Sequence, residues 1–305
     1  MHTGLEELDP LGNVDRMVAE AFQVLGDHKQ VQRGVGVVGV GGDVVGDLAA
    51  DAVEGSIRHI VLVSDIDICD NCIVLKNNNF RLTYTLSSID AKSSDDIGQL
   101  ADQVGINNSR IVSNHQIHSN LVRKIDESTR TDIQDADAMT SNIEDTGLII
   151  YTADCVPVVL IDPINKAVAA IHAGWRGTYG SIVEESISMM EKEYKTEPGD
   201  LHAYIGPFIG LGNFEVGDEL YYKFEEFMKE KSISMSDWQT AYDKIGFSYH
   251  LDLGRINELL MLALGVKSEN INKLNICTVE NSDLFYSYRA HNKTDKRIGT
   301  IIEIL

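Results

Sequence analysis

The chain has 305 residues, of which 43% are hydrophobic, and its formal net charge is −21. This length and composition allow a substantial core in one or two domains and exclude wholesale disorder. The acidic balance disfavours nonspecific attraction to nucleic acid or anionic membranes, because both need clustered basic residues. The start of the chain lacks the basic residues and apolar run of a signal peptide, and no run approaches the length of a membrane helix. We therefore expect a cytoplasmic location. Four scattered cysteines are too few for a disulfide framework in a chain of this size, so we expect reduced thiols.

The first 55 residues differ in composition from the rest of the chain. Asn13 is placed to cap a helix whose apolar residues keep helical spacing as far as Leu25. Gly34–Gly39 then matches a dinucleotide-binding glycine pattern, but the residues before it are polar rather than strand-forming. We therefore interpret residues 1–55 as an appended segment of unknown role, and residues 56–305 as the main domain.

Two short elements come next. Cys69–Cys72 has Asp-Asn at its centre, which suits a tight hairpin turn between the apolar runs at 61–63 and 73–75. A thioredoxin-type motif would begin a helix and a structural zinc site would need a second cysteine pair, so incidental cysteines are favoured over a redox pair. Helical spacing predicts a helix from Asp95 to Gly105, and a strand at Ile111-Val112 leads into a polar segment.

A cysteine and a histidine flank two apolar runs in the middle of the chain. Val156–Ile161 and Ala167–Ile171 are rich in β-branched residues, and the connection between them holds Asp, Pro and Asn, so we predict a hairpin. Cys155 precedes the first strand and His172 follows the second. Because an antiparallel hairpin brings the start of one strand to the end of the next, we expect these two side chains to be neighbours.

A helix is expected after the hairpin, from a glycine-bearing turn at Gly177-Thr178 to Tyr194. Such a turn presents unpaired backbone N–H groups and the positive end of a helix dipole, and Arg176 adds a bidentate donor, so an anion such as phosphate is favoured. An arginine held in a surface ion pair is the alternative interpretation. The other predicted elements are a strand ending at Tyr204-Ile205, helices at 216–227 and 253–264, and strands at 274–277 and 298–305.

His118, Cys155 and His172 form a candidate metal site. Two imidazoles and a thiolate are a set that Zn²⁺ accepts, and three protein ligands leave a fourth position open. A metal in such a site activates water or polarises a substrate oxygen. The same set also occurs in mononuclear copper centres. A Cys155 nucleophile with His172 as its base is an interpretation that needs no metal.

Seven short motifs resemble, in their order, those of one family. The family is the YfiH-like family, known both as multicopper polyphenol oxidase (laccase-domain) proteins and as purine nucleoside phosphorylases. The resemblance covers about residues 95–305, is faint over 56–94 and is absent before them. The motifs are Gln116-Ile117-His118, Ala136-Asp137-Ala138-Met139-Thr140, Thr152-Ala153-Asp154-Cys155-Val156-Pro157, His172-Ala173-Gly174-Trp175-Arg176-Gly177, Ile205-Gly206-Pro207, Phe214-Glu215-Val216-Gly217 and Phe285-Tyr286-Ser287-Tyr288-Arg289.

The resemblance implies an α/β fold in which mixed β-sheets are sandwiched between helices, in α/β/β/α layers, as a single catalytic domain over residues 56–305. It implies one zinc held by His118, Cys155 and His172, with Cu²⁺ as the alternative metal. The implied activity is phosphorolysis of adenosine, inosine and methylthioadenosine to the base and ribose 1-phosphate or methylthioribose 1-phosphate, with adenosine deamination at the same site. The implied partners are therefore purine nucleosides and phosphate, and phenolic substrates if the copper-dependent oxidation described for several members applies.

The resemblance also bears on residues near the metal ligands. Arg176 is the candidate phosphate contact, and Asp137, Asp154 and Glu215 are candidate acid/base groups or groups that orient a ligand imidazole. The chain departs from the family where an Asn-Arg pair usually begins the helix before the Gln-x-His motif. That pair would fall on Asp96-Ile97, so an arginine that binds anions is missing there.

Three rival functions remain at this stage. A laccase-type phenol oxidase couples four coppers through many His-x-His pairs, whereas this chain has nine histidines and no such pair. A cysteine hydrolase acting on an amide would stay active after chelation and lose its activity on thiol alkylation. A redox or metal-storage module would bind metal without turning over nucleosides.

Overall fold

The computed structural model describes residues 65–305. The helix expected between Asn13 and Leu25, the Gly34–Gly39 pattern, the apolar run at 61–63 and the boundary after residue 55 lie outside the described residues. No helix within 65–305 is both long enough and apolar enough to cross a membrane.

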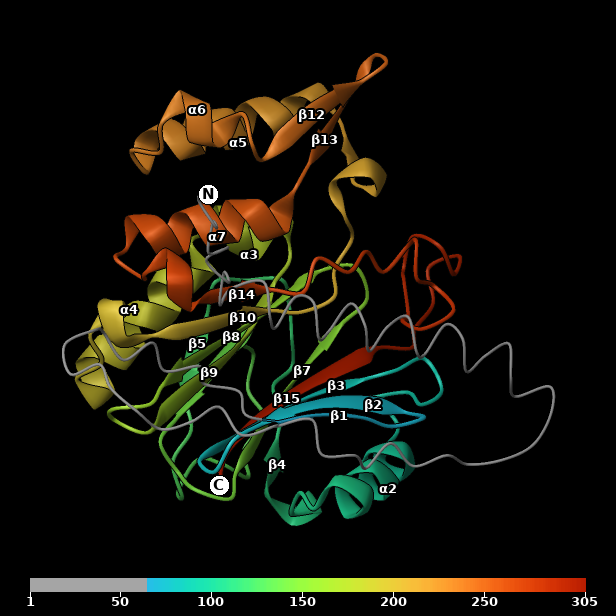
Figure 1. Ribbon diagram of the computed structural model, residues 1–305, viewed down its shortest axis with the longest axis vertical. Helices are drawn as coiled ribbons and strands as arrows, with labels where there is room; N and C mark the ends of the chain where they lie inside the picture. The colour runs from blue at the N-terminus through green and yellow to red at the C-terminus, as the bar shows by residue number, and fades with distance from the viewer. Residues whose placement is uncertain (1–64) are drawn as a thin grey trace, which may run out of the picture. The chain divides into compact units, whose positions relative to one another are not determined.

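The first sheet contains the C-terminal strand β15 among its inner strands (Figure 1). All neighbouring strands run antiparallel except β4 and β7, which are parallel. Strand β15 is buried along its whole length, because helix α2 (Ser94–Val104) covers one face of this sheet and the second sheet covers the other. The strand order is β1 (Asp65–Ile68), β2 (Cys72–Lys76), β3 (Phe80–Thr85), β15 (Ile298–Ile304), β7 (Gly147–Thr152) and β4 (Ile111–Val112).

The second sheet contains the predicted central hairpin. Strands β8 and β9 are antiparallel, with Pro157 opposite His172, which confirms the prediction. Both strands are buried at every position, as expected for apolar runs between two layers. The strand order is β14 (Ile271–Lys273), β10 (His202–Ile205), β8 (Val156–Asp162), β9 (Ala167–Ala173), β6 (Ala138–Ser141) and β5 (Val122–Lys124).

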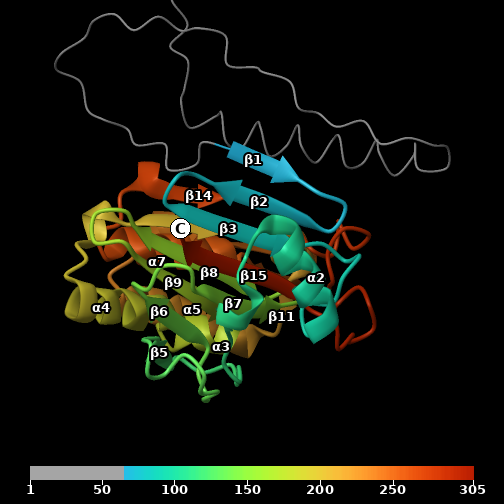
Figure 2. The same ribbon diagram turned by 90° about the horizontal axis from the view of Figure 1, so that it is seen from below.

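Helices cover the outer face of the second sheet. Side chains of α4 (Ile182–Tyr194) and α7 (Leu253–Ala263) share one core cluster with residues of β8 and β9. Figure 1 shows the resulting layers, from α2 through the two sheets to α7, and Figure 2 shows the same layers from below. The predicted α/β/β/α arrangement is therefore confirmed.

A smaller lobe lies beyond α7 at the top of Figure 1. An aromatic cluster holds it together, because the ring of Tyr221 stacks on that of Tyr249 at 3.7 Å and Trp238 is buried beside them. The lobe consists of β11 (Glu215–Val216), α5 (Asp218–Glu230), α6 (Met235–Trp238), β12 (Tyr242–Ile245) and β13 (Ser248–Leu251). The short 3₁₀ helices of the chain are η1 (Asn108–Arg110), η2 (Pro198–Asp200), η3 (Leu211–Asn213) and η4 (Ser268–Asn270).

Two expected elements differ from the structure. The helix expected from Gly177 to Tyr194 is two helices, α3 (Trp175–Tyr179) and α4. The side chain of Asn120 donates to the carbonyl of Gly180, and Ser181 has a φ of +65°, so the first helix cannot continue. The prediction of a strand at 274–277 was wrong, because the strand that pairs with β10 is β14, which ends at Lys273.

Other boundaries moved by only a few residues. The turn at Cys69–Cys72 is confirmed, since the N–H of Cys69 donates to the carbonyl of Cys72. The helices predicted at 95–105 and 253–264 are confirmed as α2 and α7. The helix expected at 216–227 begins at Asp218, because Glu215–Val216 pairs with β13.

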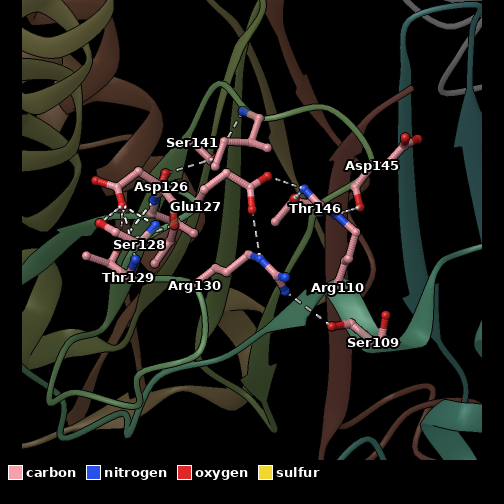
Figure 3. A network of polar contacts seen from close by, with 12 residues as sticks. Ser109, Arg110, Asp126, Glu127, Ser128, Thr129, Arg130, Ser141, Asp145 and Thr146 are labelled. Atoms are coloured by element: carbon pink, nitrogen blue, oxygen red, sulfur yellow. Dashed lines mark hydrogen bonds and ion pairs between the residues drawn. The ribbon is translucent and has the colours of Figure 1, made fainter.

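An ionic network fixes the two ends of the segment that carries His118 (Figure 3). Arg110, which precedes β4, donates to Glu127 at 2.7 Å, to the Asp145 carbonyl at 3.0 Å and to Thr146 at 3.0 Å. Glu127 also accepts from Arg130. These hydrogen bonds lower the pKa of Glu127 below its usual value. The network therefore joins the chain before β4 to the chain after β5, across the two sheets.

Close packing between the sheets gives the first prediction. Gly206 follows β10, and a Cβ atom there would lie 2.4 Å from Cε1 of Tyr84 on β3 and 3.0 Å from Pro157. We expect Gly206→Ala to lower the free energy of unfolding by about 1–3 kcal/mol, because a buried aromatic ring must move. Urea denaturation measures this, with Gly212→Ala as the control, since nothing lies within 4 Å of that position. Equal stabilities of the two variants would contradict the packing.

Candidate metal centre and its cavity

The position of Cys155 is set by the residue before it. Asp154 has a φ of +85°, a conformation that costs a non-glycine residue roughly 1–2 kcal/mol. Its carboxylate accepts from the hydroxyl of Thr278 at 2.6 Å and from the N–H of Arg289 at 2.7 Å. Its carbonyl accepts from the N–H of Ile209 at 3.0 Å. The turn that presents Cys155 at the start of β8 is therefore tied to two later segments of the chain.

Asp137 holds the loop that carries His118. Its carboxylate, which precedes β6 and is 1% exposed, accepts from the N–H groups of Ile117 at 3.2 Å, His118 at 3.0 Å and Ser119 at 2.6 Å. The hydroxyl of Ser119 also donates to it at 2.7 Å. His118 itself has a φ of +60°. One buried carboxylate therefore fixes a loop that contains a left-handed histidine.

The same carboxylate orients the second histidine. His172 lies in β9 and is buried, and its Nδ1 is 2.8 Å from Oδ1 of Asp137. The backbone N–H of His172 also donates to the carbonyl of Asp137 at 2.8 Å. An imidazole whose Nδ1–H is bound to a carboxylate presents the lone pair of Nε2, which can bind a metal ion.

The structure brings His118, Cys155 and His172 together. Their ligand atoms all lie within 4.8 Å of one another, and the two imidazole rings meet edge to face at 4.8 Å. The space beside them depends on Gly174, where a Cβ atom would lie 3.0 Å from Sγ of Cys155 and 3.2 Å from the ring of His118. Two imidazoles and a thiol around a position kept clear by glycine fit a transition-metal ion.

The charges of these groups depend on one another. Burial raises the pKa of the Cys155 thiol, but His172 and His118 outweigh it and lower that pKa to about 6. Burial lowers the pKa of His172, whereas Cys155 and Asp137 raise it to about 9. Burial raises the pKa of Asp137, but hydrogen bonds from His172 and Ser119 lower it to about 2. Without a metal, these pKa values favour a Cys155 thiolate, a His172 imidazolium and an Asp137 carboxylate, side by side. A bound metal cation would take the place of the imidazolium proton that faces Cys155.

The cluster opens into a cavity of about 680 Å³. This volume lies in the range typical of small-molecule sites, ~300–1,000 Å³. Segments from both sheets and from the loop after β14 contribute to it. The lining residues are Lys92, Asn114, His115, Gln116, His118, Tyr151, Ala153, Asp154, Cys155, His172, Trp175, Arg176, Ile209, Phe214, Leu253, Tyr288, Arg289 and Arg297.

The cavity wall combines aromatic and cationic side chains. Trp175, Phe214 and Tyr288 are among the aromatic residues, which suit the face of a heterocyclic ring. The cationic residues are four in number, although the whole chain carries a formal charge of −21. The one carboxylate of the lining, Asp154, already accepts two hydrogen bonds. The cavity therefore favours an anionic ligand or co-substrate.

Arg176 lines the cavity from the first turn of α3, with its guanidinium 4.2 Å from the ring of Trp175. It is exposed and forms no ion pair with any described residue, so the expected alternative of a surface salt bridge is wrong. Asp137 lies behind His172 rather than in the cavity wall, and Asp154 lies in the wall. Glu215 is exposed on β11, opposite His250, and is outside the cavity lining.

Asp96 and Ile97, where the sequence departs from the family pattern, have structural roles. The carboxylate of Asp96 accepts from the N–H of Asp90 at 2.7 Å, at the start of α2. Ile97 is buried in the core beneath the first sheet. Neither side chain lines the cavity.

Several cavity residues were not among those predicted from the sequence. Tyr288 and Arg289 lay inside one of the seven motifs, so their inclusion in that motif was the available signal. Lys92 and Arg297 lay in no motif. They reach the cavity through contacts between loops that are far apart in the sequence, and no local sequence pattern predicts such contacts.

The shifted thiol gives a prediction for the metal-free protein. We expect the rate of alkylation of Cys155 by iodoacetamide to rise with pH through an inflection near 6, because the thiolate is the nucleophile. Below that pH the thiol form dominates and the reaction slows. Peptide mass spectrometry separates Cys155 from Cys69, which serves as the internal control. An inflection at or above the ordinary thiol value of about 8.5 would contradict the charge arrangement.

The carboxylate behind His172 gives a second prediction. We expect Asp137→Asn to weaken metal binding by about 10–100-fold, since an amide is uncharged and has one acceptor oxygen, so it cannot accept from both the ligand imidazole and the loop of His118 as the carboxylate does. Competition against a chromogenic chelator measures the affinity. Asp135→Asn is the matched control, because Asp135 is exposed and bonds the side chain of His115. Equal affinities of the two variants would contradict the orienting role of Asp137.

Comparison with known proteins agrees with the motifs. Residues 82–305 match the family described as multi-copper polyphenol oxidoreductase laccase. A purine nucleoside phosphorylase of Bacteroides thetaiotaomicron is 42% identical over 142 residues, which are 47% of this chain and 51% of that protein. The match therefore spans about half the length of that relative. A purine nucleoside phosphorylase of Corynebacterium glutamicum is 32% identical over 205 residues, which are 67% of this chain and 78% of that protein.

Another relative carries a different name. The adenosine deaminase RL5 of an unknown prokaryotic organism is 34% identical over 198 residues, which are 62% of this chain and 73% of that protein. Among solved structures, YfiH of Bacillus licheniformis has a TM-score of 0.71 at 22% identity, over 78% of this chain and 97% of that chain. YlmD of Geobacillus stearothermophilus has a TM-score of 0.70 at 21% identity, over 80% and 98% respectively. This chain belongs to the multi-copper polyphenol oxidoreductase laccase family, the YfiH-like family that its motifs resemble.

Proposed function

We propose that this protein is a zinc-dependent purine nucleoside enzyme. It would catalyse phosphorolysis of adenosine, inosine and methylthioadenosine to the base and ribose 1-phosphate or methylthioribose 1-phosphate, and it would also deaminate adenosine. The observation that carries the proposal is the cluster of His118, Cys155 and His172 in a cavity with aromatic and cationic walls. The names of the relatives, purine nucleoside phosphorylase and adenosine deaminase, support the same substrate class.

The residues of the cavity divide between three tasks. His118, Cys155 and His172 would hold the zinc ion, which when bound supplies a Lewis acid. Asp137 keeps the ring of His172 in the tautomer that presents Nε2. Aromatic residues of the wall suit the purine ring, and the cationic residues suit phosphate.

Both reactions need a second reactant placed beside the nucleoside. In phosphorolysis an oxygen of phosphate forms a bond to the anomeric carbon of the ribose, while the bond from that carbon to the base nitrogen breaks. The base leaves with the electron pair and takes up a proton. In deamination, water adds at C6 of the purine and ammonia leaves. The cavity contributes mainly by holding the two reactants in contact and excluding bulk water.

A cysteine hydrolase is the second candidate, and one arrangement favours it. Asp137, His172 and Cys155 lie in a row in space, with the carboxylate on Nδ1 of the imidazole and the thiol on the other side of the ring. That order of groups is also found in cysteine nucleophiles activated by a histidine base. His118 has no task in such a mechanism, although its ring lies beside the other two groups. The second imidazole therefore favours the metal proposal.

A copper-dependent polyphenol oxidase at the same residues is the third candidate. The family description favours it, since it names such an activity. Coupling of several coppers needs several clusters of ligands, and among residues 65–305 the metal-binding side chains form this one cluster. The site therefore accommodates a polyphenol oxidase with a single copper ion, held by His118, Cys155 and His172.

The test combines metal analysis with product analysis. We expect one zinc per chain by mass spectrometry, and release of adenine and inosine from adenosine in phosphate buffer. Cys155→Ala should lose the metal and at least about 100-fold of both activities, because one of three ligands is removed. Cys69→Ala is the matched control, since Cys69 lies in the β1–β2 turn outside the cavity lining.

The rival candidates make different predictions in the same assay. Stoichiometric copper with phenol oxidation and no ribose 1-phosphate would overturn the proposal in favour of the oxidase. Turnover of an amide substrate that survives a chelator and ends on alkylation of Cys155 would overturn it in favour of the hydrolase.

A further inference from the structure

Two of the cavity cations come from loops that are far apart in sequence but bonded to each other. The N–H of Ala91 donates to the carbonyl of Arg297 at 3.0 Å. One carboxylate oxygen of Asp90 accepts from the N–H groups of both Lys92 and Arg297, each at 3.1 Å. The backbones of Lys92 and Arg297 are therefore held next to each other, and both side chains line the cavity.

We propose that Lys92 and Arg297 form a subsite for a phosphoryl group in the cavity wall. The inference rests on the proposed function, because it assigns the place where the phosphate of that reaction binds. An ammonium and a guanidinium together supply a point charge and a directed pair of N–H donors, which suits a tetrahedral oxyanion.

Neither side chain of the pair forms an ion pair with a residue in the described part of the chain. The ion pairs found there use other lysines and arginines, and neither Lys92 nor Arg297 takes part in one. Arg297 uses Nη1 to donate to the carbonyls of Thr294 at 2.6 Å and Lys296 at 2.8 Å, which fixes the guanidinium without cancelling its charge.

Asp90 and Asp295 are the carboxylates closest to the pair along the chain, and Asp90 is the one that accepts from the backbone of both members. Its Oδ1 already accepts two backbone N–H groups, and its own N–H donates to Asp96. Its carboxylate links the two loops by these hydrogen bonds. Asp90 is thus a positioning residue that sets the spacing between Lys92 and Arg297.

The phosphoryl group has two chemical sources. It is either free orthophosphate, as phosphorolysis requires, or the 5′-phosphate of a nucleotide that enters the cavity as one molecule. Both present the same oxyanion to Lys92 and Arg297. Binding and product measurements separate them.

The first experiment measures binding without turnover. Isothermal titration calorimetry of the metal-loaded protein with inorganic phosphate, and separately with AMP, gives the dissociation constants. We expect Lys92→Met to raise the dissociation constant for phosphate by about tenfold or more, because one charged donor is lost. Arg297→Met should act similarly, and Arg297→Lys should restore part of the affinity if charge is the main contribution.

The matched control is Lys296→Met. Lys296 is adjacent to Arg297, but its ammonium lies 5.5 Å from the ring of Tyr286, and it is outside the cavity lining. We expect its dissociation constant for phosphate and its melting temperature to equal those of the wild type. A fall in melting temperature for Arg297→Met alone would leave Lys92→Met as the deciding variant, since no hydrogen bond from the Lys92 side chain is seen among the described residues.

The second experiment measures the ratio of two products from adenosine. Phosphorolysis consumes phosphate and deamination does not, so Lys92→Met should raise KM for phosphate and lower the ratio of adenine to inosine by about tenfold. Tighter binding of AMP than of adenosine, lost in Lys92→Met while phosphate binding is unchanged, would assign the subsite to the 5′-phosphate. Unchanged affinity for both phosphate and AMP in Lys92→Met and Arg297→Met would overturn the subsite.

Failure of the proposed function looks different from failure of the subsite. If adenosine, inosine and methylthioadenosine are all inert, the proposed function fails, while the calorimetric arm still decides whether Lys92 and Arg297 bind a phosphoryl group. If nucleosides turn over but the variants bind phosphate as the wild type does, only the subsite fails.

Discussion

One buried carboxylate connects the parts of the site that the sequence keeps apart. Asp137 accepts three backbone N–H groups and a hydroxyl from the loop of His118, and it binds the ring of His172 from the central hairpin. A charge buried to this degree is stable because these donors replace the water it has lost. Since the loop of His118 contains a left-handed histidine, loss of the carboxylate would release both histidines together.

A second carboxylate performs a similar task on the other side of the cluster. Asp154 ties the turn before Cys155 to Thr278 and to the backbone of Arg289. The segment after β14 carries Tyr288 and Arg289 into the cavity wall, so the residue that positions the thiol also positions part of the ligand cavity. The metal ligands and the cavity are thus built on shared contacts, and each depends on packing between the two sheets.

Much of the core was predictable from local patterns. The hairpin of β8 and β9 followed from two apolar runs around an Asp-Pro-Asn turn, and it placed Cys155 near His172. The break between α3 and α4 was missed: Gly180 and Ser181 are local signals for it, but the hydrogen bond that holds the Gly180 carbonyl comes from Asn120, far away in the sequence. Lys92 and Arg297 were missed for the same reason, since their places depend on pairing between loops from opposite ends of the domain.

The central claim is that His118, Cys155 and His172 hold one zinc ion in the cavity. X-ray anomalous diffraction from crystals of the full chain, recorded on both sides of the zinc and copper absorption edges, tests it most directly. The account predicts a single zinc peak in bonding contact with Sγ of Cys155 and Nε2 of His172, and with a ring nitrogen of His118. A copper peak at that position, or a zinc peak bound elsewhere on the chain with these three side chains unliganded, would contradict it.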